Sequence, residues 1–186
     1  FGNKFLTGGY LVSLSNFTLD GGNGPEDYLV ALSSSGDVVV YQGTDPNSVP
    51  AAFSIVGVWN IGHLPTGRRQ AANSGGDLYI LCSQGVVSVT QILKGVDPGI
   101  VPAYITGKIT PLVRLDIASK GTQLGWSLTN HAAESMLILT VPDGGEDYTT
   151  YRQYVMDTTT RAWTRFLGVP MHCIAVWKNS LYMGCP

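Results

Sequence analysis

Two acidic, glycine-rich segments are the first places where this sequence could bind a metal ion. Residues 20–27 read Asp-Gly-Gly-Asn-Gly-Pro-Glu-Asp, and residues 143–147 read Asp-Gly-Gly-Glu-Asp. Ca²⁺ binds clustered carboxylate and carbonyl oxygens, but neither segment has the ligand spacing of a calcium-binding loop. Gly, Asn and Asp are also the residues that close tight turns. We therefore interpret both segments as solvated turns and predict no metal site.

The histidines and cysteines do not form a recognisable ligand or redox pattern. The chain has three of each: His63, His131, His172, Cys82, Cys173 and Cys185. A zinc site needs four converging ligands, and the histidines have no cysteine or carboxylate at ligand spacing. An odd number of cysteines without such spacing is typical of reduced, buried thiols in an intracellular protein. A disulfide between Cys173 and Cys185 is the alternative.

The sequence lacks the pattern of a nucleophilic or acid–base active site. Residues 33–35 are three serines, but the chain has no G-x-S-x-G nucleophile elbow. A glycosidase needs two carboxylates that face each other across a pocket, and the glutamates Glu26, Glu134 and Glu146 all fall in segments expected to be loops. We therefore predict that the protein is not an enzyme and uses no cofactor.

Arg68 and Arg69 form the most prominent basic feature of the chain. Because arginine grips carboxylate and phosphate groups, we predict that these two residues lie at a contact between subunits or face DNA in a channel. The alternative is a surface dipeptide at the start of a strand, since isolated exposed charges are common. No basic groove accompanies the four tryptophans, so a core or interface role is favoured for them over base stacking.

The composition indicates a folded, β-rich module. Of the 186 residues, 44% are hydrophobic, 13% are charged and 23 are glycine. Disorder requires low hydrophobicity and high net charge and is excluded, while abundant Gly, Val, Thr and Tyr favour short strands joined by tight turns. A net charge of −2 does not indicate a basic surface that would wrap nucleic acid. A low content of charged residues suits surfaces that partner subunits cover. No apolar run approaches the ~18–20 residues that span a membrane, so we expect no membrane anchor.

A short pattern recurs along the chain: an acidic or polar residue, an alternating apolar strand and a turn. Its first apolar residues are Tyr28, Leu78, Met136 and Leu181, which lie at intervals of 50 (78−28), 58 (136−78) and 45 (181−136) residues. Self-similarity at roughly 40–50 residues, built from short strands, is the signature of β-propeller blades. The repeat therefore predicts an all-β propeller-like fold.

The repeat divides the chain into blades. We predict one all-β module over residues 1–186, with blades at 5–60, 68–106 and 125–166 and a partial blade at 172–186. Within the second blade, residues 68–73 and 86–92 are each predicted to be one strand. Closed propellers need four or more blades, so we expect an open or partial propeller. The chain starts with Phe1 and stops just after the fourth copy of the pattern, so we expect it to be a fragment of a longer protein.

Residues 108–120 do not follow the alternating apolar pattern of the predicted strands. Apolar residues recur there at near-helical spacing, Pro111 suits a first helical turn and Gly121 suits a helix end. We predict one short helix in this segment, inserted between two blades.

Several segments resemble sequences from tailed bacteriophages and prophages. The stretches that carry the resemblance are residues 21–28, 35–46, 56–62, 68–69, 75–81, 153–157, 162–166 and 177–184. They are similar to a block found in phage tail and head-to-tail structural proteins, and the resemblance covers most of the chain. By a looser similarity, they look like the tail nozzle or tail-hub proteins of short-tailed phages, which use propellers as subunits of a ring.

The resemblance implies a non-enzymatic structural component of a phage tail or head-to-tail connector, made in the bacterial cytoplasm and built into the virion. Its implied partners are other virion proteins and copies of itself in a homo-oligomer, with non-specific contact with passing DNA. A mildly acidic wall would let DNA slide instead of holding it. The alternative is a ligand- or glycan-binding propeller module that acts in host adsorption, for which Tyr148 and Tyr151 offer rings that stack on sugars.

Overall fold

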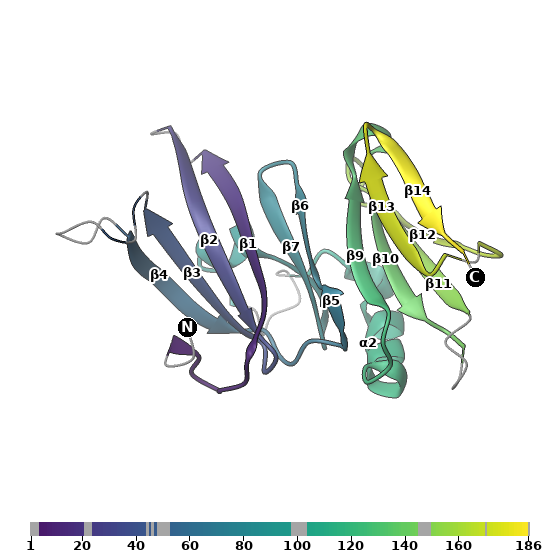
Figure 1. The fold of residues 1–186 in the computed structure, drawn as a ribbon, viewed down its shortest axis with the longest axis horizontal. Coiled ribbons are helices and arrows are strands. Elements are labelled where there is room, and N and C mark those ends of the chain that lie inside the picture. The colour runs from purple at the N-terminus through teal and green to yellow at the C-terminus, as the bar shows by residue number, and fades with distance from the viewer. Residues whose placement is uncertain are drawn as a thin grey trace.

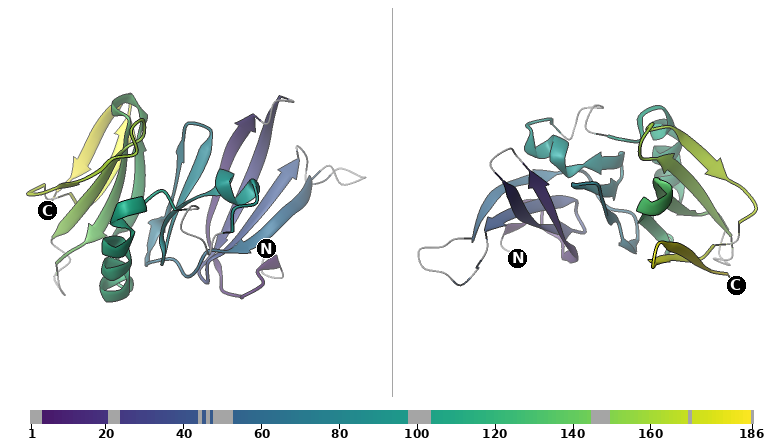
Figure 2. Two further views of the ribbon diagram at one scale, coloured as in Figure 1. Left: turned by 180° about the vertical axis from the view of Figure 1, so that it is seen from behind. Right: turned by 90° about the horizontal axis from the view of Figure 1, so that it is seen from above.

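The computed structural model describes residues 4–20, 24–43, 45, 47, 53–97, 104–144, 150–169 and 171–185. Its regular structure is mostly β-strand, arranged in four sheets that stand side by side in a row (Figure 1). Seen from above, the row bends into an arc that does not close (Figure 2). The predicted fold, an all-β open arrangement of blades with a short inserted helix, is confirmed.

The first sheet is an antiparallel meander of four consecutive strands. Its order is β1 (Leu11–Asp20), β2 (Pro25–Ser33), β3 (Asp37–Gly43) and β4 (Phe53–Asn60). The turn between β2 and β3 depends on Gly36, whose φ of 87° is strained for any residue with a Cβ atom. A Cβ atom at this position would also collide with the backbone of Gly62. Glycine therefore lets this turn pack against the chain that leaves β4.

The second sheet is shorter and ends in a helix. It contains β6 (Ala71–Ser74), β7 (Asp77–Cys82) and β8 (Gly85–Ser88), and Tyr104 adds a single antiparallel bridge to β8. The strand predicted over residues 86–92 is too long, because helix α1 (Val89–Leu93) begins after Ser88. The Ser88 side chain accepts a hydrogen bond from the backbone N–H of Gln91 and so caps the helix.

The third sheet combines four consecutive strands with one from earlier in the chain. β9 (Trp126–His131), β10 (Met136–Pro142), β11 (Tyr151–Asp157) and β12 (Trp163–Phe166) form an antiparallel meander, and β5 (Gly67–Arg69) pairs parallel to β9. The single strand predicted over residues 68–73 is therefore wrong, because β5 and β6 belong to different sheets. The chain changes sheets at Gln70, whose buried side chain donates a hydrogen bond to the carbonyl oxygen of Pro65 at 3.0 Å.

The predicted helix and a terminal hairpin complete the fold. Helix α2 (Thr110–Lys120) follows a 3-10 turn (Gly107–Ile109), with Pro111 in its first turn and Gly121 directly after it. The fourth sheet is the hairpin of β13 (Cys173–Trp177) and β14 (Ser180–Gly184). Its two turn residues, Lys178 and Asn179, have positive φ values of 46° and 62°, which suit a two-residue hairpin turn.

Apolar side chains fill the layers between successive sheets. In β7, Leu78 and Ile80 pack with the first sheet, whereas Tyr79 and Leu81 pack with the third. All four are at most 2% exposed, and burial of each contributes roughly 1.5–3 kcal/mol. Because the central sheets are covered on both faces, β7 reads as a continuous apolar run and not as a strict alternation.

Candidate functional site

The first strand of each meander lies next to the first strand of the following one. β1 contacts β6, β6 contacts β9, and β9 contacts β13. These four strands, which we call the inner strands, follow one another across the molecule (Figure 1). A propeller places such strands around its central axis, so this face is where a channel would be found.

Two asparagine side chains join the inner strands. Asn73 in β6 donates through Nδ2 to the carbonyl oxygen of Asn16 in β1, at 2.8 Å. Asn130 in β9 donates in the same way to the carbonyl oxygen of Asn73, also at 2.8 Å. Each hydrogen bond contributes about 0.5–1.5 kcal/mol net. We call Asn16, Asn73 and Asn130 the asparagine row.

The row occupies equivalent positions in three sheets. Each asparagine lies directly opposite a leucine of the next strand, in the pairs Asn16 and Leu29, Asn73 and Leu78, and Asn130 and Leu137. In the second sheet, the pair Asn73 and Leu78 lies next to Ser74 and Asp77, the pair that closes the hairpin turn. We take the pair at the same place in the fourth sheet as its equivalent. In the fourth sheet this pair is Val176 and Leu181. The terminal hairpin therefore has valine, which lacks a side-chain donor, where the other sheets have asparagine.

This register corrects the alignment of the sequence repeat. The equivalent residues are Leu29, Leu78, Leu137 and Leu181, at intervals of 49 (78−29), 59 (137−78) and 44 (181−137) residues. Tyr28 packs toward the second sheet, whereas Leu78 packs back toward the first, so the two residues are not equivalent. A shift of one residue along a strand moves each side chain to the opposite face.

The asparagine row was not predicted, although the sequence contains a signal for it. Asn16 and Asn73 are 57 residues apart, and so are Asn73 and Asn130. The loops within the three sheets differ in length, so the intervals between the equivalent leucines of the second strands vary. The asparagines of the inner strands keep a constant interval. A search for polar residues at a fixed interval would have identified them.

Arg69 ties the terminal hairpin to the inner strands. Its guanidinium group donates through Nη1 to the carbonyl oxygen of Ile174 in β13, at 2.7 Å. Arg69 also lines a groove of about 400 Å³ between β6, β9 and β13, together with Ala71–Asn73, Leu128–Asn130 and Ile174–Val176. Arg68 lies in β5 as well, but its side chain is outside the described part of the structure. The structure thus gives Arg69 a contact between sheets within one chain.

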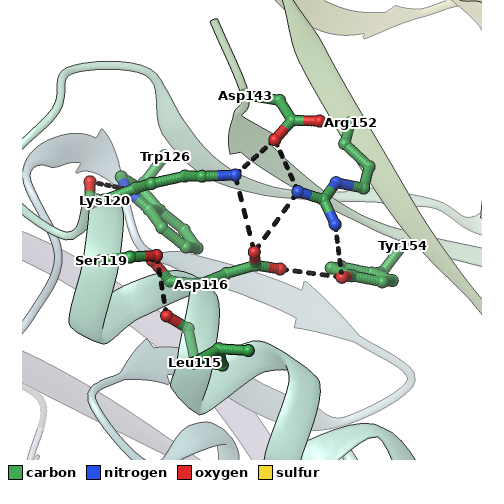
Figure 3. A network of polar contacts seen from close by, with 8 residues as sticks. All are labelled: Leu115, Asp116, Ser119, Lys120, Trp126, Asp143, Arg152 and Tyr154. Atoms are coloured by element: carbon green, nitrogen blue, oxygen red, sulfur yellow. Dashed lines mark hydrogen bonds and ion pairs between the residues drawn. The ribbon is translucent and has the colours of Figure 1, made fainter. Parts of the chain in front are cut away.

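An ionic network centred on the buried Asp116 holds helix α2 against the third sheet (Figure 3). Asp116 of α2 accepts hydrogen bonds from Tyr154 Oη at 2.8 Å and from Arg152 Nη2 at 3.3 Å. Arg152 also binds Asp143 at 2.6 Å. Lys120 completes the network by contacting both carboxylates.

Burial and charge set the titration of this network. Burial, followed by the hydrogen bond to Asp116, raises the pKa of Tyr154 to about 12. Burial opposes ionisation of Asp143, but hydrogen bonds from Lys120 and Arg152 prevail and lower its pKa. Lys120 and Arg152 therefore hold Asp143 as an anion and also contact Asp116, an arrangement that suits anchoring of α2 more than proton transfer.

The two acidic turns show no metal cluster in the part that can be described. Residues 21–23 and 145–147 lie outside the described residues. Across the residues that the structure describes, no group of three or more His, Cys, Asp or Glu side chains could hold a metal ion. The histidines are dispersed: His131 Nε2 lies 3.0 Å from the carbonyl oxygen of Asn179, and the His172 ring packs against Tyr151 with centroids 4.8 Å apart.

The expectation that the cysteines are buried is wrong for two of the three. Cys82 is buried, but Cys173 and Cys185 are exposed, and all three are free thiols. Burial raises the pKa of Cys82 to about 11, which makes this thiol unreactive. Cys173 is exposed because it lies on the terminal hairpin, which has no further sheet against it in the described structure.

The serines and tryptophans have mainly structural surroundings. Ser33 is buried, and its hydroxyl accepts a hydrogen bond from the backbone N–H of Asp37 in the β2–β3 turn. Trp126 is buried and donates through Nε1 to the carbonyl oxygen of Lys120. Trp177 differs, because it is 65% exposed on the terminal hairpin.

Comparison with known proteins identifies no relative. No protein-family model matches the chain, and no curated protein matches it significantly.

Among the described helices, none is both long enough and apolar enough to cross a membrane.

Proposed function

We propose that this protein is a non-enzymatic structural component of a bacteriophage tail or head-to-tail connector, which packs against copies of itself and against neighbouring virion proteins. The observation that carries the proposal is an open row of sheets with apolar side chains exposed at both ends. At one end Trp177 and Tyr182 are 65% and 56% exposed, and at the other Leu14 and Ile55 are 48% and 37% exposed. Exposed apolar surfaces of this kind mark interaction sites.

Helix α2 supports the proposal with a third apolar surface. Leu112 and Leu115 lie on its outer side and are 52% and 67% exposed. Val113 and Ile117 are buried on the other side of the helix, and Asp116 with its ionic network fixes the helix to the third sheet. A rigidly held helix with exposed leucines suits a contact with a different protein of the virion.

The proposal includes non-specific contact with passing DNA along the inner strands. Arg69 lines the groove there, and a formal net charge of −2 would keep the wall weakly repulsive, so that DNA slides past it.

The glycan-binding alternative receives less support from the described residues. Tyr148 lies outside them, and Tyr151 is half-buried with its ring against His172. A ring held in this way offers less of its face to a sugar. A glycan array probed with the purified protein would test this alternative directly.

Antibody labelling of purified virions tests the proposed function. Particles of the phage or induced prophage that encodes this chain would be labelled with an antibody to residues 1–186 and viewed by negative-stain microscopy. We expect label at the tail or at the portal vertex, and no label when the antibody has first been absorbed with the purified protein. Virions without label, with the protein found only in the lysate of infected cells, would overturn the proposal.

A further inference from the structure

We infer that the first sheet binds the terminal hairpin of a second copy of this chain, head to tail, with Asn16 of one copy donating to the carbonyl oxygen of Val176 in the other. This inference deepens the proposed function, on which its role in a virion rests, by naming the partner and the two faces involved. Four features of the described residues carry it.

The first feature is the direction of the row. We call the two faces of each sheet the preceding face and the following face. The preceding face is the one that bears the asparagine and its opposing leucine, or Val176 and Leu181 in the hairpin, and the following face is the other. In the second sheet, Leu78 on the preceding face packs with the first sheet and Tyr79 on the following face packs with the third. Within the described residues, no sheet covers the preceding face of the first sheet or the following face of the hairpin. The two ends of the row are therefore the two halves of the contact that the row repeats internally.

The second feature is the hydrogen-bonding group left at the start of the row. Asn73 and Asn130 each donate to a carbonyl oxygen of the preceding inner strand. Asn16 has the same place in its sheet, but its side chain is exposed and makes no hydrogen bond to the described residues. By the register of the sheets, its acceptor in a preceding hairpin would be the carbonyl oxygen of Val176.

The third feature is a matched pair of apolar faces. Tyr182 lies opposite Ala175 in the hairpin, just as Tyr79 lies opposite Ala72 in the second sheet. Tyr79 is 2% exposed because the third sheet covers it, whereas Tyr182 is 56% exposed. The difference in exposure between Tyr182 and Tyr79 shows how much of the Tyr182 ring a following sheet would bury.

The preceding face of the first sheet offers the complementary surface. Leu14 and Ile55 are exposed on it, and the rings of Tyr41 and Phe53 stack there at 5.3 Å. Phe5 packs on the same face, but against Ala31 and Val39 near its middle. Docking of Trp177 and Tyr182 on this face would remove the largest exposed aromatic rings of the hairpin from water.

The fourth feature is charge. Turn ends of successive inner strands adjoin, as the contact between His131 and the carbonyl oxygen of Asn179 shows. Head-to-tail docking therefore brings the hairpin turn, with Lys178, beside the β1–β2 end of the first sheet, where Asp27 lies on the preceding face opposite Thr18. Opposite charges at these two ends favour this orientation over a symmetric one, in which like ends meet.

Site-directed disulfide formation tests the inference. Two variants would be made in a background with Cys173→Ser and Cys185→Ser, one with Asn16→Cys and the other with Ala175→Cys, because Ala175 shares the following face with Tyr182 and its equivalent, Ala72, lies beside Asn130. After mild oxidation of an equimolar mixture, we expect a dimer that contains one copy of each variant, and no larger product, because each copy has one accessible cysteine. Each variant alone should give at least tenfold less dimer. As a matched control, Asn16→Cys mixed with Arg114→Cys should behave like the single variants, since Arg114 lies on the exposed side of α2.

Sedimentation of the unmodified chain provides the second measurement. We expect concentration-dependent association that Leu14→Asp or Trp177→Asp abolishes in each variant alone. Mixing the two variants should restore a one-to-one dimer, because each keeps the face that the other has lost. Equal disulfide formation by the single variants would overturn the inference in favour of a symmetric contact. A strictly monomeric chain without the mixed disulfide would also overturn it and would mean that something other than a second copy covers these faces. Tail labelling of virions combined with such a monomer would leave the proposed function standing without this partner.

Discussion

Replacing Asp116 by alanine tests whether the ionic network holds helix α2 on the third sheet. Asp116 is 7% exposed and accepts hydrogen bonds from Tyr154 and Arg152 at 2.8 and 3.3 Å. Without this carboxylate, the Tyr154 hydroxyl keeps only its contact with Arg152 at 3.3 Å, on a residue that is 4% exposed. Arg152 keeps Asp143 as its partner.

The expected cost follows from these contacts. A hydrogen bond to a charged group contributes about 1.5–3 kcal/mol, so the loss of two gives an upper range of about 3–6 kcal/mol. The remaining partner of Arg152 and the better helix propensity of alanine, about 0.5 kcal/mol, reduce this loss. We expect Asp116→Ala to lower the free energy of unfolding by about 3 kcal/mol, or the Tm by about 6–12 °C for a chain of this size. Tyr154→Phe should cost about 1.5–3 kcal/mol, since it removes the hydrogen bond to the Asp116 carboxylate and the longer contact with Arg152.

Chemical denaturation followed by tryptophan fluorescence provides the assay, with Trp126 beside the C-terminal end of α2 as the local reporter. The variant with both Asp116→Ala and Tyr154→Phe should lose about 1 kcal/mol less stability than the sum of the losses of the two single variants, because the two residues share a contact. Leu115→Ala, at a 67% exposed position of the same helix, is the matched control and should change stability little. If Asp116→Ala stays within about 0.5 kcal/mol of the unmodified protein, or if the two effects simply add, the network does not anchor the helix.

Three further predictions concern acid stability, thiol reactivity and the terminal hairpin. Since the pKa of Asp143 is lowered in the folded protein, its stabilising effect is present above its unfolded pKa of about 4 and is lost as the pH falls through the folded value. An acid titration of Trp126 fluorescence should show this loss, and Asp143→Asn should remove it; an unchanged titration would contradict the assignment. Alkylation of the native protein followed by mass spectrometry should modify Cys173 and Cys185 quickly and Cys82 only after unfolding, because Cys82 is buried with a raised pKa, and rapid labelling of Cys82 would refute its burial. Arg69→Met should speed hydrogen exchange in residues 173–177 and leave the first sheet unchanged, since it removes one bond to the carbonyl oxygen of Ile174; uniform loss of protection would show that Arg69 has a global role.

Local sequence patterns were sufficient to predict most strands and the helix. Apolar runs bounded by polar or turn-forming residues predict strands over residues 151–157 and 173–177, and β11 and β13 have these bounds. Pro111 and Gly121 mark the ends of α2 for similar local reasons. These features depend on backbone chemistry within a few residues, which a sequence displays directly.

The errors arise where tertiary contacts decide between local options. Residues 68–73 look like one strand, but pairing of β5 with β9, which follows it much later in the chain, divides them between two sheets. The one-residue error in aligning the repeat arose because Tyr28 and Met136 are as apolar as the leucines that follow them, so polarity alone does not define the face. The ionic network was missed because Asp116, Asp143 and Arg152 come from separate segments and only the fold brings them together.

The consecutive order of strands in each sheet has a consequence for how the chain is made. Most pairings join neighbouring strands, so contact order within a sheet is low and each sheet can form soon after its residues leave the ribosome. The first sheet then offers a finished face on which the second can condense, and so on along the chain, while the pairing of β5 waits until β9 has been synthesised. Such nearest-neighbour assembly resembles the growth of a linear repeat array. A chain built in this order could gain or lose one unit by duplication or deletion without rethreading the others.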